Sequence, residues 1–194
     1  MHLVVGLRNP GSKYEGTRHN VGFEVATRAV DRAGEKLGKA PSRLRTMIGQ
    51  VGVSENRVLY AVPNTFMNES GAAVRAALDY YGLGADSLLV IHDDIDLRFG
   101  RLRLQVAGGS GGHNGIRSLE KSLGTKDFSR LKFGVGRPPA SMDPSDFVLR
   151  DFTKAERPEV DLMIEDAADV VELWSTEPAR AQEMAAHRGG DQSS

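Results

Sequence analysis

The run Leu88-Leu89-Val90-Ile91-His92-Asp93-Asp94 decides the fold class of this chain. Its first four residues are apolar and too few for a helix, so they predict a strand buried on both faces. The run then becomes polar, which places His92, Asp93 and Asp94 at the carboxyl end of that strand. In sheets of α/β proteins, functional sites gather at the carboxyl ends of strands.

Strand and helix patterns alternate on both sides of this run. We predict an α/β fold, a single three-layer α/β/α sandwich around a twisted mixed sheet, because strands alternate with helices and one pair of strands forms a hairpin. Residues 35–43 are predicted as a loop, Ser54-Glu55-Asn56 as the hairpin turn, and the helix at 159–174 as the last one. The predicted strands are 3–7, 45–53, 57–62, 88–91, 102–106 and 130–135, and the predicted helices are 20–34, 69–81, 116–123 and 159–174.

Length and composition limit the possible organisation. With 194 residues, no internal repeat and no long linker, the sequence predicts one domain over residues 1–188 and a disordered tail over 189–194. The absence of cysteine excludes a disulfide framework, thiolate metal sites and a cysteine nucleophile. No apolar run approaches the roughly 18 residues that cross a bilayer, and the N-terminus lacks a signal-peptide pattern. We therefore expect a cytoplasmic protein that does not bind membranes.

Charge is divided unevenly along the chain. Residues 1–140 hold 20 Lys and Arg against 13 Asp and Glu, a net charge of +7. Residues 141–194 hold 5 against 13, a net charge of −8. A basic body is typical of a polyanionic partner, although two ordinary solvated faces explain the same totals.

His19 is the first candidate for chemistry. It stands in the polar stretch Thr17-Arg18-His19-Asn20, just before a predicted helix. Histidine titrates near neutral pH and serves as a general base when a carboxylate fixes its tautomer. Asp93, at the end of its strand, is the best candidate for that carboxylate. Taken alone, a histidine in a loop is more often an ordinary surface residue.

Four asparagines stand at strand ends or helix starts: Asn9, Asn20, Asn68 and Asn114. Because an amide carries both a donor and an acceptor, several converging amides can recognise a peptide-like substrate without a charge. A single asparagine at such a position more often caps backbone groups.

The glycine run Gly108-Gly109-Ser110-Gly111-Gly112 permits three interpretations. It lacks the Lys-Ser/Thr pair of a P-loop, so nucleotide binding has little support. It fits the G-x-S-x-G pattern of a nucleophile elbow, but the only later histidines are His113 and His187, which argues against a Ser110 triad. The third interpretation is a flexible backbone lip beside a substrate, with His113 and Asn114 as the edge that contacts it.

The histidine and aspartates at the end of the central strand are also metal-ligating types. His92 and Asp94 share one face of an extended chain while Asp93 points to the other. No second histidine lies at ligand spacing in the sequence, so we expect no metal site.

Five segments, in order along the chain, carry a family resemblance. Two of them are Tyr14-Glu15-Gly16-Thr17-Arg18-His19-Asn20-Val21-Gly22 and Gly108-Gly109-Ser110-Gly111-Gly112-His113-Asn114-Gly115-Ile116-Arg117. The other three are residues 5–11, 65–71 and 92–97. Together they resemble the motifs of bacterial-type peptidyl-tRNA hydrolases, and the resemblance runs from Met1 to about residue 185.

The resemblance implies an activity and a set of roles. The activity is cleavage of the ester between a peptide and the 3′ end of tRNA, by a cytoplasmic monomer that needs no metal or organic cofactor. His19 would be the general base that activates water, and Asp93 would hold and polarise it. Asn9 would help to distinguish a blocked from a free amino group. The other substrate-binding positions would be Tyr14, Phe66, Met67, Asn68, His113 and Asn114.

One position departs from the family pattern. Gln105 stands where members often have a lysine that forms half of a clamp on the tRNA 5′-phosphate. Lys132 stands at the position of the second residue of this clamp, which is usually an arginine. Arg103, on the same strand face as Gln105, is a candidate to compensate. A tRNA phosphate backbone would also give the basic body its partner.

Two other interpretations stay open from the sequence. One is an RNA-binding module without catalysis, as in plastid splicing factors that resemble this fold. The other is a serine esterase that uses Ser110. The presence of His19, Asp93 and the asparagines favours the hydrolase.

Overall fold

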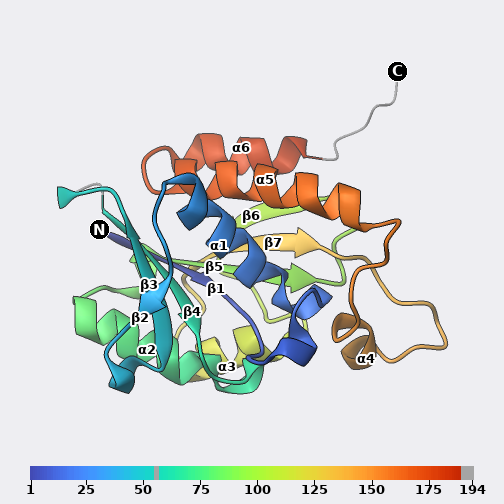
Figure 1. The fold of residues 1–194 in the computed structure, drawn as a ribbon, viewed down its shortest axis with the longest axis horizontal. Helices are drawn as coiled ribbons and strands as arrows, with labels where there is room; N and C mark the ends of the chain where they lie inside the picture. Colours follow the sequence, from blue (N-terminus) through green and yellow to red (C-terminus); the bar gives the residue numbers. More distant parts are fainter. Residues whose placement is uncertain (55–56, 189–194) are drawn as a thin grey trace.

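A seven-stranded mixed sheet forms the middle layer of the molecule (Figure 1). The computed structural model describes residues 1–54 and 57–188. The strand order is β2-β3-β4-β1-β5-β7-β6, in which β4, β1, β5 and β7 run parallel and β2, β3 and β6 run antiparallel to their neighbours. The strands are β1 (His2–Gly6), β2 (Gly38–Lys39), β3 (Thr46–Val51), β4 (Val58–Pro63), β5 (Leu88–Asp94), β6 (Leu102–Val106) and β7 (Ser129–Gly134).

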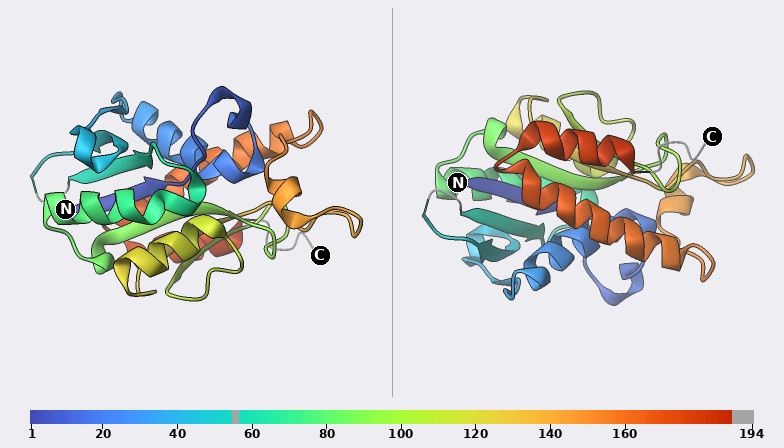
Figure 2. Two further views of the ribbon diagram at one scale, coloured as in Figure 1. Left: turned by 90° about the horizontal axis from the view of Figure 1, so that it is seen from below. Right: turned by 90° about the horizontal axis from the view of Figure 1, so that it is seen from above.

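Helices cover both faces of the sheet, which confirms the predicted three layers (Figure 2). One face carries α1 (Val21–Arg32), α5 (Arg157–Trp174) and α6 (Pro178–His187), and the other carries α2 (Ser70–Tyr81) and α3 (Asn114–Leu123). The short α4 (Pro144–Val148) lies outside these layers, beyond the carboxyl ends of the parallel strands (Figure 1). Short 3-10 turns occupy Ser12–Tyr14, Arg18–Asn20, Ser42–Leu44, Met67–Glu69 and Ala85–Ser87. Among the helices of the described residues, none is long and apolar enough to cross a membrane.

The central strand β5 is buried on both faces, as its sequence predicts. Leu89 and Ile91 join the apolar cluster under α1 and α5, and Leu88 and Val90 join the cluster under α2 and α3. All four side chains have no exposed surface. Burying apolar area on both faces of one strand ties the two helical layers together and fixes the position of the polar residues at its end.

Helix α1 approaches the sheet so closely that only glycine fits at the contact. A Cβ on Gly22 would lie 2.2 Å from the carbonyl oxygen of Ile91, and a Cβ on Gly6 would lie 2.3 Å from the carbonyl oxygen of Gly22. The contact presses the first turn of α1, and with it the preceding turn at Arg18–Asn20, against the ends of β1 and β5.

The structure corrects two predictions about secondary structure. Residues 35–43 are not entirely loop, because Gly38–Lys39 forms β2 against β3. The helix at 159–174 is not the last one, because α6 follows it and includes His187. The buried face of α6 consists of Ala181 and Ala185, and these small residues gave too weak an apolar pattern to be recognised. Part of the predicted hairpin turn, residues 55–56, and the predicted tail at 189–194 lie outside the described residues.

Candidate active site

A pocket of ≈ 790 Å³ opens at the carboxyl ends of the parallel strands. Asn9 follows β1, residues 66–68 follow β4, and Asp93 lies near the end of β5. His19 reaches the pocket from the turn before α1, and His113 reaches it from the start of α3. The strand ends therefore bring together side chains that are far apart in the sequence, as expected for a site in an α/β sheet.

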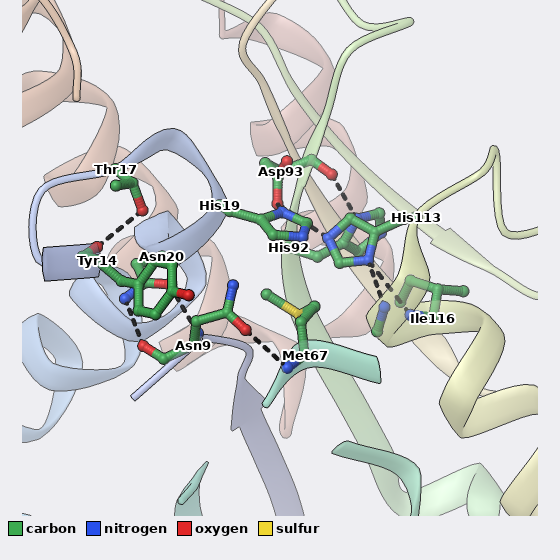
Figure 3. A network of polar contacts seen from close by, with 11 residues as sticks. Asn9, Tyr14, Thr17, His19, Asn20, Met67, His92, Asp93, His113 and Ile116 are labelled. Atoms are coloured by element: carbon green, nitrogen blue, oxygen red, sulfur yellow. Dashed lines mark hydrogen bonds and ion pairs between the residues drawn. The ribbon is translucent and has the colours of Figure 1, made fainter. Parts of the chain in front are cut away.

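Two histidines share one oxygen of Asp93 (Figure 3). His19 Nδ1 lies 2.8 Å from Asp93 Oδ1, and His113 Nε2 lies 2.9 Å from the same oxygen. The two imidazole rings come from opposite helical layers, with their centroids 4.7 Å apart. Asp93 is 2% exposed, so its charge is shielded from water and acts strongly on both rings.

The backbone of α3 fixes the tautomer of His113. Its Nδ1 accepts hydrogen bonds from the backbone N–H groups of Gly115 and Ile116, at 3.1 and 3.3 Å. An imidazole nitrogen that accepts carries no proton, so the proton must reside on Nε2. His113 is therefore a neutral donor to Asp93. Burial lowers the pKa of His113 more than Asp93 raises it, which agrees with this state.

His19 has the opposite arrangement. A carboxylate accepts only, so His19 donates from Nδ1 to Asp93 and keeps its lone pair on Nε2. That Nε2 has no hydrogen-bond partner among residues 1–54 and 57–188. Burial opposes protonation of His19, but Asp93 outweighs burial and the pKa of His19 is raised above 6.5. Although burial also opposes its charge, contact with the two histidines lowers the pKa of Asp93.

His92 is a third histidine in this cluster, although the sequence predicts no role for it once a metal site is excluded. Its Nδ1 donates to the carbonyl oxygen of Asp93 at 2.7 Å, and its ring meets that of His113 edge to face. Burial lowers the pKa of His92 to about 3, so it is neutral. His92 thereby packs against the ring of His113 and leaves the Asp93 carboxylate to His19 and His113.

The side-chain carbonyl oxygen of Asn9 is hydrogen-bonded within the protein, which leaves the side-chain amide nitrogen for the pocket. Its Oδ1 accepts from the backbone N–H of Met67 at 2.8 Å. Its backbone N–H and carbonyl are both bonded to the side chain of Asn20, at 2.8 and 2.9 Å. Figure 3 shows the Asn9 amide nitrogen turned towards the His19 imidazole. Asn20 is thus a buried clamp on Asn9 and does not itself line the pocket.

The other predicted substrate-binding residues divide into two groups. Phe66, Asn68 and Asn114 are exposed and line the pocket, and Met67 lines it from a buried position. Tyr14 does not line the pocket; its backbone carbonyl accepts from the hydroxyl of Thr17 and its ring lies under Lys13.

The two cations predicted to hold a tRNA phosphate lie beside each other outside the pocket. Arg103 and Lys132 are cross-strand neighbours on β6 and β7. Arg103 is exposed, whereas Lys132 is mostly buried and its Nζ lies 2.9 Å from Asp94 Oδ2. The side-chain amide of Gln105 donates to the carbonyl of Ala107, so this side chain fixes the start of the glycine run. Lys132 therefore has an internal partner that a phosphate would have to replace.

Ser110 lines the pocket but has no base beside it. Both nitrogens of His113 are already engaged, by the helix amides and by Asp93. His187 is exposed on α6, where its Nδ1 donates to the Glu183 carbonyl. This geometry gives no support to a serine esterase.

The donor atoms of His19, Asp93 and His113 lie within 4.8 Å of one another and form a group of metal-ligating types. Local spacing could not reveal this group, because its members come from three distant segments. The donor set fits hydrogen bonding better than metal binding. His113 Nε2 carries a proton, and one carboxylate oxygen already accepts from both rings.

One wall of the pocket comes from a segment in which the sequence predicts no functional residue. Residues 143–149, which include α4, contribute Asp143, Pro144, Ser145, Val148 and Leu149 to the lining. No motif or periodic pattern marks these residues. Leu149 is 42% exposed, a large apolar side chain left open at the pocket. Only the folded arrangement brings this segment over the ends of the strands.

Comparisons with known proteins give a consistent result. The family model described as Peptidyl-tRNA hydrolase matches residues 3–192. A peptidyl-tRNA hydrolase of Mycobacterium tuberculosis is 48% identical over 171 residues, which cover 88% of this chain and 89% of the relative. One of Pseudarthrobacter chlorophenolicus is 43% identical over 185 residues, covering 95% and 94%. The crystal structure of peptidyl-tRNA hydrolase from Acinetobacter baumannii matches with a TM-score of 0.90 at 32% identity, covering 97% of this chain and 95% of that one.

Proposed function

The chain belongs to the peptidyl-tRNA hydrolase family and is a peptidyl-tRNA hydrolase, and we propose that it works through water activated by His19. The single observation that carries this mechanism is the bond from His19 Nδ1 to Asp93. It leaves the Nε2 lone pair of His19 without a partner at the pocket, where it can accept a proton.

The proposed reaction needs no covalent intermediate. His19 Nε2 takes a proton from a water molecule while the water oxygen attacks the ester carbonyl carbon. The negative charge of Asp93 stabilises the imidazolium that forms. As the bond to the ribose 3′-oxygen breaks, His19 returns the proton to that oxygen, which leaves the peptide acid and free tRNA. An ester is activated enough for a general base and water to suffice.

The substrate would bind across the pocket with tRNA on one side and peptide on the other. In this proposal Asn9, Asn68, His113 and Asn114 surround the peptide and the attacking water, and Met67 packs beside them. Phe66, half exposed at the pocket, offers a flat apolar surface for the 3′-terminal base. Tyr14, outside the pocket lining, would contact the tRNA end farther from the reacting bond. We propose that Lys132 and Arg103 contact phosphate and that the enzyme acts as a cytoplasmic monomer.

Replacement of His19 tests the mechanism directly. We expect His19→Ala to lower kcat on N-acetyl-aminoacyl-tRNA by about 10² to 10⁴-fold, because general-base catalysis is worth that much. Binding of the substrate should largely survive. His187→Ala, at an exposed histidine outside the pocket lining, is the matched control and should keep full turnover. Near-normal turnover by His19→Ala would refute the mechanism.

Two competing interpretations predict different results in the same assay. A non-catalytic RNA-binding module would bind tRNA but release no labelled peptide with the wild-type protein. A serine esterase would lose turnover on Ser110→Ala, whereas the proposed mechanism predicts that this variant keeps most of its activity.

A further inference from the structure

Arg18 is a buried arginine that the proposed reaction does not use. It directly precedes His19 in the chain and is only 4% exposed. Its guanidinium contacts two aromatic rings from the C-terminal part of the chain, 4.3 Å from the centroid of Phe147 and 5.1 Å from that of Phe152. A buried charge is costly unless it is paired, so the partners of its two terminal nitrogens indicate its purpose.

Those partners all lie in one distant segment. One terminal nitrogen of Arg18 donates to both carboxylate oxygens of Glu156, at 2.9 and 2.7 Å. The other donates to the backbone carbonyls of Arg150 and Asp151, at 3.2 and 2.7 Å. The planar fork of arginine suits this combination of carboxylate, carbonyl and ring contacts, and lysine cannot reproduce it.

The backbone reinforces the same connection. The N–H of Arg18 donates to the Arg150 carbonyl at 3.1 Å, and the N–H of Phe152 donates to the Gly16 carbonyl at 3.3 Å. Thr17 and Asp151 form an isolated antiparallel bridge. Residues 16–18 and 147–156 thus form one connected unit, which we call the Arg18 clasp.

The Arg18 clasp connects two parts of the candidate site. On one side it continues directly into His19, whose position relative to Asp93 depends on the turn at Arg18–Asn20. On the other side it holds Val148 and Leu149, the apolar wall of the pocket. A peptide packed against this wall and the base that serves its ester are therefore positioned by the same set of contacts.

We propose that Arg18 is a positioning residue that aligns His19 with the apolar wall formed by Val148 and Leu149. This inference rests on the proposed role of His19 as the base. Without Arg18, substrate still binds through its tRNA part, but the wall and the base no longer hold a fixed distance. Small displacements of a base relative to the bond it serves are enough to cost about 10²-fold in rate.

Kinetics of Arg18→Met and Arg18→Lys test the proposal. At a temperature well below unfolding, we expect Arg18→Met to lower kcat by about 10 to 100-fold and to leave KM for N-acetyl-aminoacyl-tRNA close to the wild-type value. Arg18→Lys keeps the positive charge without the planar guanidinium, so its kcat should lie between those of Arg18→Met and the wild type. If Arg18→Met fails to fold, Glu156→Gln serves in its place and should lower kcat to a smaller extent.

Arg157→Met is the matched control. Arg157 also pairs with a carboxylate on the α1 side, Glu24, and joins α1 to α5, but it touches neither His19 nor the wall. We expect it to lower thermal stability without lowering kcat. If Arg18→Met and Arg157→Met both lower stability alone, with kcat per folded molecule unchanged, Arg18 is merely a structural residue and the inference is wrong.

A double variant separates this inference from the proposed function. In the His19→Ala background, Arg18→Met should lower kcat little further, because it acts through His19. Full additivity of the two effects would overturn the coupling while leaving His19 as the base. Normal turnover by His19→Ala alone would instead overturn the proposed function itself.

Discussion

At the scale of single residues, Asn9 shows how bonds already made decide what a side chain can offer. Its Oδ1 is engaged by the Met67 amide, and its backbone is engaged by Asn20. What remains for a substrate is the amide N–H₂, a pure donor. A peptide carbonyl accepts such a bond, whereas the ammonium of a free aminoacyl-tRNA would meet a donor with another donor. We expect this mismatch beside the buried Asn9 to disfavour the free amine.

Asn9→Asp tests this explanation of selectivity. The substitution keeps an oxygen for Met67 but replaces the free donor with a carboxylate oxygen that accepts an ammonium. We expect the ratio of hydrolysis rates for N-acetyl-aminoacyl-tRNA over free aminoacyl-tRNA to fall. Measuring both substrates with wild type and variant gives that ratio directly. An unchanged ratio would mean that the discrimination depends on another residue.

Asp93 controls the pH dependence expected of His19. His19 serves as a base only when neutral, and Asp93 raises the pKa of His19 above 6.5 against the opposing effect of burial. Activity should therefore fall as the pH drops through that raised pKa. In Asp93→Asn the attraction is lost and burial dominates, so the acid limb of the kcat profile should move to lower pH. The plateau should also fall, though less than in His19→Ala, because the base remains but is poorly oriented. If the acid limb does not move, it reports the titration of a group other than His19.

At the scale of elements, the contact of α1 with the sheet at Gly22 sets the position of the turn at Arg18–Asn20, which carries His19. Gly22→Ala would place a methyl group 2.2 Å from the Ile91 carbonyl, and neither backbone can yield without disturbing the core. We expect a loss of about 1–3 kcal/mol or more in the free energy of unfolding, measured by denaturant titration. Gly109→Ala is the control, since nothing lies within 4 Å of its Cβ position. Equal stability of the two variants would contradict the argument.

The elements also show where sequence reasoning succeeds and where it stops. Strand β5 could be predicted because it is a short, continuous apolar run, and helix α5 because its apolar residues repeat at helical spacing over many positions. Helix α6 could not, because alanines supply its buried face. The pairing of His19 with Asp93 could be proposed, since one precedes a helix and the other ends a strand. The sharing of Asp93 with His113 could not, because it depends on how α3 approaches the sheet.

At the scale of the whole molecule, acidic residues of the C-terminal segment pair with arginines of the basic body on one face of the sheet. Three acidic residues of α5 pair with arginines of α1: Arg28 with Glu165, and Arg32 with Glu165, Asp169 and Glu172. The basic residues on β6 and β7 lie on the other side of the sheet, away from these carboxylates. The net charge of the body therefore overstates the cations available to RNA, and Lys132, paired with Asp94, illustrates the reason.

The salt dependence of tRNA affinity tests the role of Lys132. Binding should weaken steeply as salt rises, because phosphate contacts release counterions. Lys132→Ala should reduce the slope of log affinity against log salt by about one unit or less. Asp94→Asn provides the opposite variant: it removes the competing carboxylate and should tighten binding at a given salt concentration. If Lys132→Ala leaves the slope unchanged, Arg103 is the next residue to replace.

The amides that α3 donates to His113 also limit how many protons the site can store. His113 cannot accept another proton without losing both helix bonds, and His92, with a pKa of about 3, stays neutral. Of the three histidines in contact, only His19 has room for one. In the proposed reaction, the proton taken from water would therefore be the one delivered to the leaving ribose oxygen, and a second water could not be activated before that delivery. Each turnover would thus pass one proton from the attacking water, through His19, to the ribose oxygen of the product.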